Sequence, residues 1–200
     1  VRAGARYLHS RSDIKFIGFI DADLSTDFED FNGLLKTLKT NKELSFVFGS
    51  RAKNASDMIR KNGVRAMISK AINILIVFIL GLSIHDTQCG AKVFKADLVP
   101  VIFNQNFFSR WLFDVEMFIK MKRHFGKAEI MNKIYEQSLQ RWVHMEDSKL
   151  GIKDSLEIPY RLVSIWFNYN ILQYLNYTKQ SIAQDPIIEV FGIPTPSLAA

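Results

Sequence analysis

Cysteine and histidine are scarce in this sequence. One cysteine, Cys89, stands among 200 residues, so no disulfide can form within the chain and a reducing compartment is expected. The four histidines are scattered and lack the spacing of zinc ligands. Neither a disulfide-stabilised secreted domain nor a zinc protein is therefore expected.

Long apolar segments are missing as well. Residues 1–10 are polar and include Arg2 and Arg6, which is unlike a signal peptide. The longest apolar run covers residues 71–84, and a helix needs about 20 residues to span a bilayer. The run is too short to predict a transmembrane helix and indicates a buried or interfacial one.

Aromatic residues and positive charge are abundant instead. The chain has 16 Phe, 6 Tyr and 3 Trp, and its formal net charge is +6. A partner that is both anionic and apolar fits these features: nucleic acid, a phosphate-bearing substrate or a membrane surface. Charge alone does not distinguish such a protein from an ordinary, slightly basic globular one.

Apolar runs that alternate with amphipathic segments predict an α/β fold with a largely parallel sheet. The predicted strands are residues 16–20, 44–48, 92–94 and 129–135. The predicted helices are residues 1–9, 28–39 with Asp27 as N-cap, 58–82 and 111–122. Pro159 is predicted to open a final aromatic helix that reaches about Tyr177, and an irregular tail follows.

An acidic turn follows the first predicted strand. Asp21 and Asp23 of its D-x-D motif stand at a strand end, where ligands bind in parallel α/β folds. Two carboxylates there can reach one hard divalent cation, and such a cation can neutralise a departing diphosphate. Taken alone, the motif also fits a solvated acidic turn before a helix.

A phosphatase is an alternative for the same turn. Haloacid dehalogenase-type phosphatases place D-x-D-x-[ST] after their first strand, and Asp21, Asp23 and Ser25 match that pattern. That class also needs a second acidic pair after a later strand. Glu146 and Asp147 follow a poor strand candidate, so the second motif is not found.

Several motifs occur in a fixed order along the chain. They are DADLS at 21–25, GSRA at 49–52, Arg65 with Ser69, DTQCGAKVF at 86–94, RWLFDVEMF at 110–118 and SK at 148–149. In this order they resemble the polyprenyl-phosphate (dolichyl-phosphate) glucosyltransferases of glycosyltransferase family 2, from about Arg2 to Lys149. The long, unusual strings DTQCG and RWxFDVE carry most of the resemblance.

The resemblance implies a fold and an activity. The fold is GT-A, a Rossmann-like nucleotide-diphospho-sugar transferase core. The activity is inverting transfer of a hexose, with UDP-glucose as the favoured donor, to a polyprenyl or dolichyl phosphate. Mg²⁺ or Mn²⁺ is the implied cofactor. The implied location is the cytoplasmic face of a membrane, peripheral or monotopic, and no nucleic-acid partner is expected. A truncated binding or scaffold protein without turnover is the remaining alternative.

The resemblance also implies an organisation of the chain. Residues 1–150 correspond to a partial GT-A domain, 151–180 to an aromatic amphipathic helix and 181–200 to an irregular tail. In this family, strands with P-x-[YF]-N-E and D-D-G-S type motifs precede the first strand seen here. We therefore expect the N-terminal strands, and half of the donor pocket, to be missing from these 200 residues, and the fragment alone to be inactive.

Residue roles carry over position by position. Asp21 and Asp23 resemble the pair that binds the metal and the nucleotide-sugar. Asp86 and Asp114 are the two candidates for a carboxylate at the sugar, with Asp86 slightly favoured, and Gly90 is expected to bring backbone close to the sugar. The remaining positions that resemble substrate-binding residues are Gly49, Ser50, Arg51, Arg65, Ser69, Gln88, Ser148 and Lys149.

Physical chemistry is compatible with the phosphate roles. The planar fork of an arginine can bind phosphate oxygens in a way that lysine cannot. Arg65 and Ser69 are four residues apart, so on a helix they share a face. The alternatives are a solvated helix face for Arg65, a turn residue for Arg51 and a plain surface lysine for Lys149.

Overall fold

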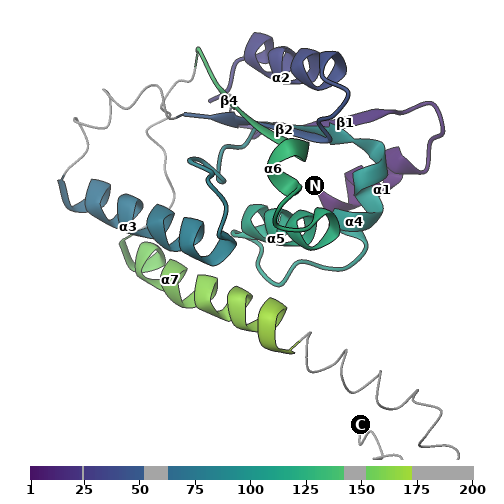
Figure 1. Cartoon of the computed structure of the whole chain (residues 1–200). Coiled ribbons are helices and arrows are strands. Elements are labelled where there is room, and N and C mark those ends of the chain that lie inside the picture. Colours follow the sequence, from purple (N-terminus) through teal and green to yellow (C-terminus); the bar gives the residue numbers. More distant parts are fainter. Residues whose placement is uncertain (24, 52–62, 142–151, 173–200) are drawn as a thin grey trace, which may run out of the picture. The chain divides into compact units, whose positions relative to one another are not determined.

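A four-stranded sheet organises the computed structural model, which describes residues 1–23, 25–51, 63–141 and 152–172, with backbone only for 63–69, 152–156 and 172 (Figure 1). The α/β prediction is confirmed. The strands lie in the order β1-β3-β2-β4. Their bounds are β1 Phe16–Phe19, β2 Phe46–Ser50, β3 Lys92–Lys95 and β4 Ile134–Ser138.

The sheet is mixed, whereas the sequence predicted a largely parallel one. β2 and β4 are parallel, but β3 lies antiparallel between β1 and β2. The register shows the direction of β3. Lys92, at the start of β3, pairs with Phe19 at the end of β1 and with Phe48 near the end of β2. β3 therefore begins at the end of the sheet where β1 and β2 finish.

The helices of the described ranges surround this sheet. They are α1 Arg2–His9, α2 Phe28–Thr40, α3 Gly63–Leu80, α4 Val99–Phe103, α5 Phe113–Phe125, α6 Ile130–Lys133 and α7 Ile152–Phe167, with a short 3-10 helix η2 Ala96–Leu98 and a short π-helix η3 Asn168–Leu172. The predicted start of α2 is confirmed, since the side chain of Asp27 accepts a hydrogen bond from the Glu29 N–H at 2.7 Å. The predicted strand at 129–135 instead begins as α6, and β4 follows it.

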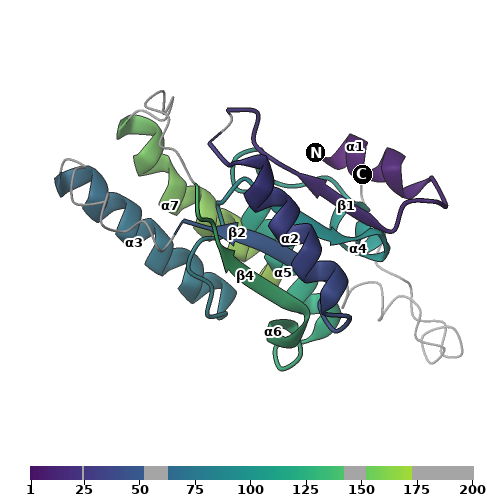
Figure 2. The same cartoon turned by 90° about the horizontal axis from the view of Figure 1, so that it is seen from above.

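One face of the sheet packs against α2, as the view from above in Figure 2 shows. Leu34 and Leu38 on α2 are buried against Val47 of β2 and Val93 of β3. The alternation of side chains along a strand sends the neighbouring residues to the opposite face. The Leu–Val cluster therefore anchors α2 directly after the acidic turn at 21–27.

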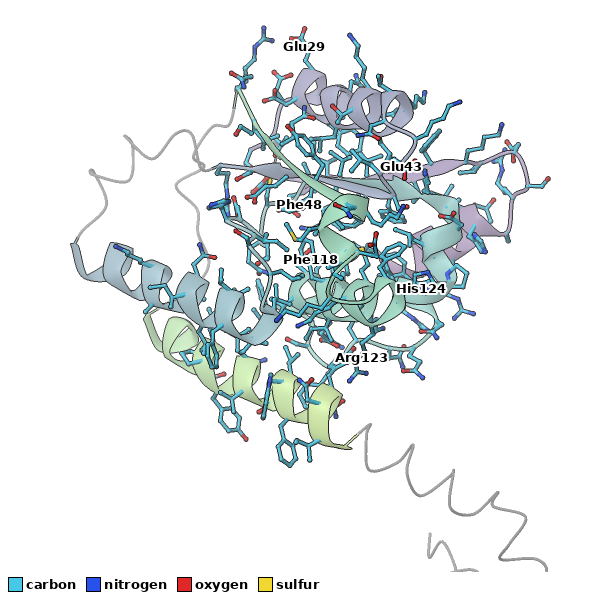
Figure 3. All side chains as sticks on the ribbon, viewed as in Figure 1. Glu29, Glu43, Phe48, Phe118, Arg123 and His124 are labelled. Atoms are coloured by element: carbon cyan, nitrogen blue, oxygen red, sulfur yellow. The ribbon has the colours of Figure 1, made fainter. Side chains whose placement is uncertain are left out.

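The other face is aromatic and packs against α4 and α5. Figure 3 shows Phe48 of β2 and Phe118 of α5 pointing toward one another, and their rings meet edge to face at 5.0 Å. Phe46 stacks on Phe94 at 6.0 Å, and Phe94 meets Phe103 of α4 at 5.7 Å. Buried aromatic pairs of this kind contribute through both area and ring geometry, so they fix α5 on the sheet.

The C-terminal helix differs from its prediction. Residues 1–162 form one compact unit and residues 163–200 a second, of which the structure describes 163–172. α7 begins at Ile152, so Pro159 lies inside the helix and does not open it. A proline at this interior position leaves one helical hydrogen bond unmade, because it has no N–H to donate. None of the helices in the described ranges has the length and apolar character needed to cross a bilayer.

Candidate functional site

Three chain segments meet at one edge of the sheet. β1 and β2 end there and β3 starts there, because β3 is antiparallel to both. The D-x-D turn follows β1, Arg51 follows β2, and the segment 86–91 leads into β3. Residues that are far apart in the sequence thus become neighbours at the strand ends, where α/β folds bind ligands.

Asp21 lies directly against Gly90. A Cβ atom at position 90 would stand 1.9 Å from Asp21 Oδ2, so only glycine leaves room for this carboxylate. Burial raises the pKa of Asp21, Asp23 adds to this, and Lys92 and Arg51 act in the opposite direction. The close approach at Gly90 is to the acidic turn, and the expected approach of this backbone to the sugar stays a prediction.

Asp23 is held by its own turn. Its Oδ1 accepts a hydrogen bond from the Ser25 N–H at 2.9 Å. Both side chains of the D-x-D motif therefore stand at the sheet edge, one against Gly90 and one braced by local backbone.

Arg51 and Asp86 form a two-pronged ion pair. Arg51 Nε and its terminal nitrogen each lie 2.7 Å from an oxygen of Asp86, and the Arg51 backbone N–H donates to the same carboxylate at 3.0 Å. Burial opposes ionisation of Asp86, but the hydrogen bonds from Arg51 outweigh it and hold its pKa below the usual value. Arg51 remains 39% exposed and faces the site edge.

Glu136 was missed by the sequence analysis. It lies on β4 beside Phe48, and its carboxylate accepts the backbone N–H groups of His85 and Asp86, both at 2.9 Å. These bonds fix the backbone on which Asp86 stands. The available signal was an acidic residue inside a predicted strand, but its partners lie some 50 residues away and are not visible in the pattern.

Lys92 and Asp114 form a second, deeper pair. Lys92 Nζ lies 2.8 Å from Asp114 Oδ1, and the lysine side chain is 0% exposed. Burial raises the pKa of Asp114, while Lys92 opposes that rise. Glu116, two residues further on, instead accepts the backbone N–H groups of Phe108 and Ser109 at 2.8 and 2.7 Å. Asp114 and Glu116 therefore have different partners, as side chains two residues apart on a helix point to different faces.

The segment between Asp86 and Gly90 carries polar atoms without a protein partner. In the described part of the chain, Thr87 Oγ1 and Gln88 Nε2 are buried and accept or donate no hydrogen bond. Buried polar atoms normally have a partner, so these two unpaired atoms are unusual. Burial raises the pKa of the Cys89 thiol to about 11, which leaves it protonated near neutral pH.

The other predicted positions differ in how they are placed. Gly49 and Ser50 are buried at the end of β2, and a Cβ at Gly49 would stand 2.8 Å from Cys89 Sγ. Arg65 and Ser69 lie on α3, whose backbone alone is described there. Ser148 and Lys149 lie outside the described residues.

Negative charge prevails at this edge. Four carboxylates (Asp21, Asp23, Asp86 and Asp114) and two cations (Arg51 and Lys92) interact here, which leaves a formal charge of −2. Within the described ranges, no group of three or more His, Cys, Asp or Glu side chains is placed to hold a metal ion. The carboxylates of Asp21 and Asp23 are hard oxygen donors, the ligand type that divalent cations such as Mg²⁺ prefer.

Comparison with known proteins identifies the fold class of this chain. No family model matches the chain. The fold resembles that of glucosyl-3-phosphoglycerate synthase from M. tuberculosis, with a TM-score of 0.56 and 14% identity over 84% of this chain and 53% of that one. The protein has the GT-A fold of nucleotide-sugar glycosyltransferases.

Sequence relatives of this chain share one description among the glycosyltransferases. The chain is 30% identical over 178 residues to a dolichyl-phosphate beta-glucosyltransferase of Trichomonas vaginalis, covering 86% of this chain and 51% of the relative. Enzymes of the same description match at 30% identity in Dictyostelium discoideum (78% and 47% covered) and 32% in Saccharomyces cerevisiae (84% and 51%). The chain is a dolichyl-phosphate beta-glucosyltransferase-like protein, and it spans about half the length of these relatives.

Proposed function

We propose that this chain carries the site of a family 2 glycosyltransferase, which transfers a hexose from a nucleotide-sugar to dolichyl or polyprenyl phosphate with inversion. Glucose from UDP-glucose is the proposed donor group. The relatives support the acceptor and the sugar, since all three are named dolichyl-phosphate beta-glucosyltransferases. The alternative phosphatase is not favoured, because both the fold and the relatives belong to glycosyltransferases.

The acidic turn against Gly90 is the observation that carries the proposal. Asp21 and Asp23 provide hard oxygen ligands at a site of formal charge −2, which suits one Mg²⁺ or Mn²⁺. Such a cation, when bound, stabilises the negative charge of a departing nucleoside diphosphate. Asp21 and Asp23 would hold this cation, which would position the donor diphosphate at the strand ends.

The two candidate carboxylates at the sugar receive different roles. Asp86 uses both oxygens on Arg51, so we assign it to orienting that guanidinium toward a phosphate. Asp114 then becomes the candidate that faces the sugar, which reverses the preference drawn from the sequence. A phosphate acceptor is already ionised near neutral pH, so this carboxylate has to orient the sugar more than to remove a proton.

Contact with a membrane surface completes the proposal. Ile74 and Phe78 lie one turn apart on α3, are exposed, and Phe78 is 81% exposed. An apolar helix face of this kind binds at the lipid interface of a membrane that also holds the acceptor. Motifs alone assign four residues to the acceptor side of the site, which we place at the cytoplasmic face of the membrane. They are Arg65, Ser69, Ser148 and Lys149.

Calorimetric titration of UDP-glucose with and without Mn²⁺ tests the metal-dependent donor site. In the full-length protein, Asp23→Asn should lose the Mn²⁺-dependent part of the affinity, about tenfold or more, while the thermal unfolding midpoint stays the same. Asp13→Asn is the matched control, because Asp13 is an exposed acid that forms an ion pair with the neighbouring Arg11, in the described part of the chain. If the Asp23 variant keeps full Mn²⁺-dependent affinity, the metal assignment is wrong.

A further inference from the structure

Lys92 is a cation sealed inside the protein at the edge of the site. Its side chain is 0% exposed, and its Nζ lies 2.8 Å from Asp114 Oδ1. The ammonium also donates to the Cys89 carbonyl and lies 5.7 Å from the centre of the Phe19 ring. It therefore touches the segment before β3, the end of β1 and the first turn of α5 at once.

The register of the sheet explains how a lysine reaches this position. Lys92 and Phe94 are two residues apart on β3, so both side chains point to the aromatic face on which α5 packs. Phe94 fills that face with a ring, whereas Lys92 places an ammonium under Asp114. Sealing an ammonium from water is costly unless strong partners compensate, and an apolar side chain would pack at the same place without that cost.

The charge of Lys92 is shared by several groups of the site. It favours the ionised forms of Asp114, Asp21 and Asp86 alike. No substrate can reach the ammonium, because water does not. Any influence of Lys92 on a reaction must therefore pass through the carboxylates that line the site.

We propose that Lys92 is a positioning residue that holds the Asp114 carboxylate in place beside Asp21 for the transfer step. The inference rests on the proposed function. It assigns a role to a residue that lies in the DTQCGAKVF motif but was not among the candidate site residues. Lys92 acts through Asp114 without touching donor or acceptor.

A purely structural pair is the competing explanation. Replacing both members of a buried ion pair by neutral side chains of similar size is often harmless or stabilising, whereas removing one member is not. A structural pair therefore predicts that the double neutral variant regains both stability and turnover. A positioning pair predicts that it regains stability alone.

The experiment compares Lys92→Met, Asp114→Asn and the double variant in the full-length protein. Turnover of UDP-glucose onto dolichyl phosphate and urea unfolding are measured for each. We expect Lys92→Met to lower kcat at least tenfold with the KM for UDP-glucose within about twofold of wild type. The double variant should unfold at a higher urea concentration than Lys92→Met, yet its kcat should equal that of Asp114→Asn.

Lys120→Met is the matched control. Lys120 is also a buried lysine and lies on α5, the helix that carries Asp114. Its Nζ donates to the Ile102 carbonyl at 2.9 Å, away from the acidic cluster. This variant should lose stability but keep kcat per folded molecule. Its comparison with Lys92→Met separates the stability that is lost with a buried lysine from the turnover that is lost when Asp114 is no longer held in place.

Each remaining outcome overturns a defined statement. Wild-type kcat in Lys92→Met, or in the double variant, overturns the positioning role. A loss of kcat in Lys92→Met with none in Asp114→Asn shows that Lys92 does not act through Asp114. If Lys92→Met does not fold, the double variant and Asp114→Asn still decide between the two explanations. Absence of transfer in the wild type instead contradicts the proposed function itself.

Discussion

Gly90 and Asp21 are so close that position 90 has no room for a side chain. Gly90→Ala should displace the Asp21 carboxylate and weaken Mn²⁺ binding at least tenfold, because a Cβ cannot stand 1.9 Å from an oxygen. Mn²⁺ binding can be followed by electron paramagnetic resonance of the free ion. Gly4→Ala is the control, since a Cβ at that helical position meets nothing within 4 Å and alanine favours helix. Equal Mn²⁺ affinity in both variants would contradict the geometry.

The Arg51–Asp86 pair predicts a pH dependence of stability. Because the pKa of Asp86 is lower in the folded protein than its usual 3.8, the pair stabilises the fold above that value and is lost as the pH falls through the lowered pKa. Asp86→Asn should reduce the free energy of unfolding by about 2 kcal/mol at pH 7, a moderate figure because Arg51 is partly solvated. Urea unfolding of both proteins from pH 7 to pH 3 measures it. The difference should shrink below pH 4, and a constant difference would contradict the assignment.

The single residues of the site were only partly predictable from the sequence. Asp21 and Asp23 were found because their motif follows an apolar run, and Asp86 and Asp114 because they stand in unusual strings. Lys92 and Glu136 were not, since their partners lie 22 and 50 or more residues away in the chain. Periodicity shows which residues share a face, but it does not show which strands become neighbours.

At the scale of elements, Glu116 fixes the segment that leads into α5. Its carboxylate is fully buried and takes one backbone N–H from Phe108 and one from Ser109. A glutamine at this position has only one acceptor oxygen. Its NH₂ group, which is a donor, would face one of the two backbone N–H donors. Glu116→Gln should therefore reduce the free energy of unfolding by about 2 kcal/mol, as hydrogen bonds to a charged group are lost.

Urea unfolding at pH 7 checks this value. Glu129→Gln serves as the control, because Glu129 is exposed and, among the residues that the structure describes, its carboxylate accepts one long hydrogen bond, from the Asn132 side chain at 3.3 Å. That change should alter the unfolding free energy by less than about 0.5 kcal/mol. Equal effects of the two substitutions would mean that Glu116 does not organise the segment before α5.

The elements were predicted well where the chain is apolar and poorly where it is not. β2 is buried at every position and its run of apolar residues marks it clearly. β4 is half polar, IYEQS, and its start was misplaced because the four residues of α6 precede it with similar composition. The direction of β3 depends on where the chain re-enters the sheet, which only the pairing of Lys92 with Phe48 reveals.

At the scale of the molecule, charge is divided between the chain and its site. The whole chain carries +6, whereas the cluster at the sheet edge carries a formal −2. Under the proposed function, the basic chain would attract the anionic donor and the lipid phosphate, and the acidic cluster would attract a divalent cation. These opposite signs fit a protein that joins two phosphate-bearing substrates around one divalent ion.

The most direct measurement is transfer of labelled glucose. The full-length protein is incubated with UDP-glucose labelled in the sugar, dolichyl phosphate in detergent and Mn²⁺, and the lipid extract is counted. The account predicts labelled lipid that requires both dolichyl phosphate and Mn²⁺, and a loss of at least a hundredfold in Asp21→Asn, because that carboxylate holds the metal and the donor diphosphate. Absence of label from the lipid extract of the wild type, or an undiminished rate in Asp21→Asn, would contradict it.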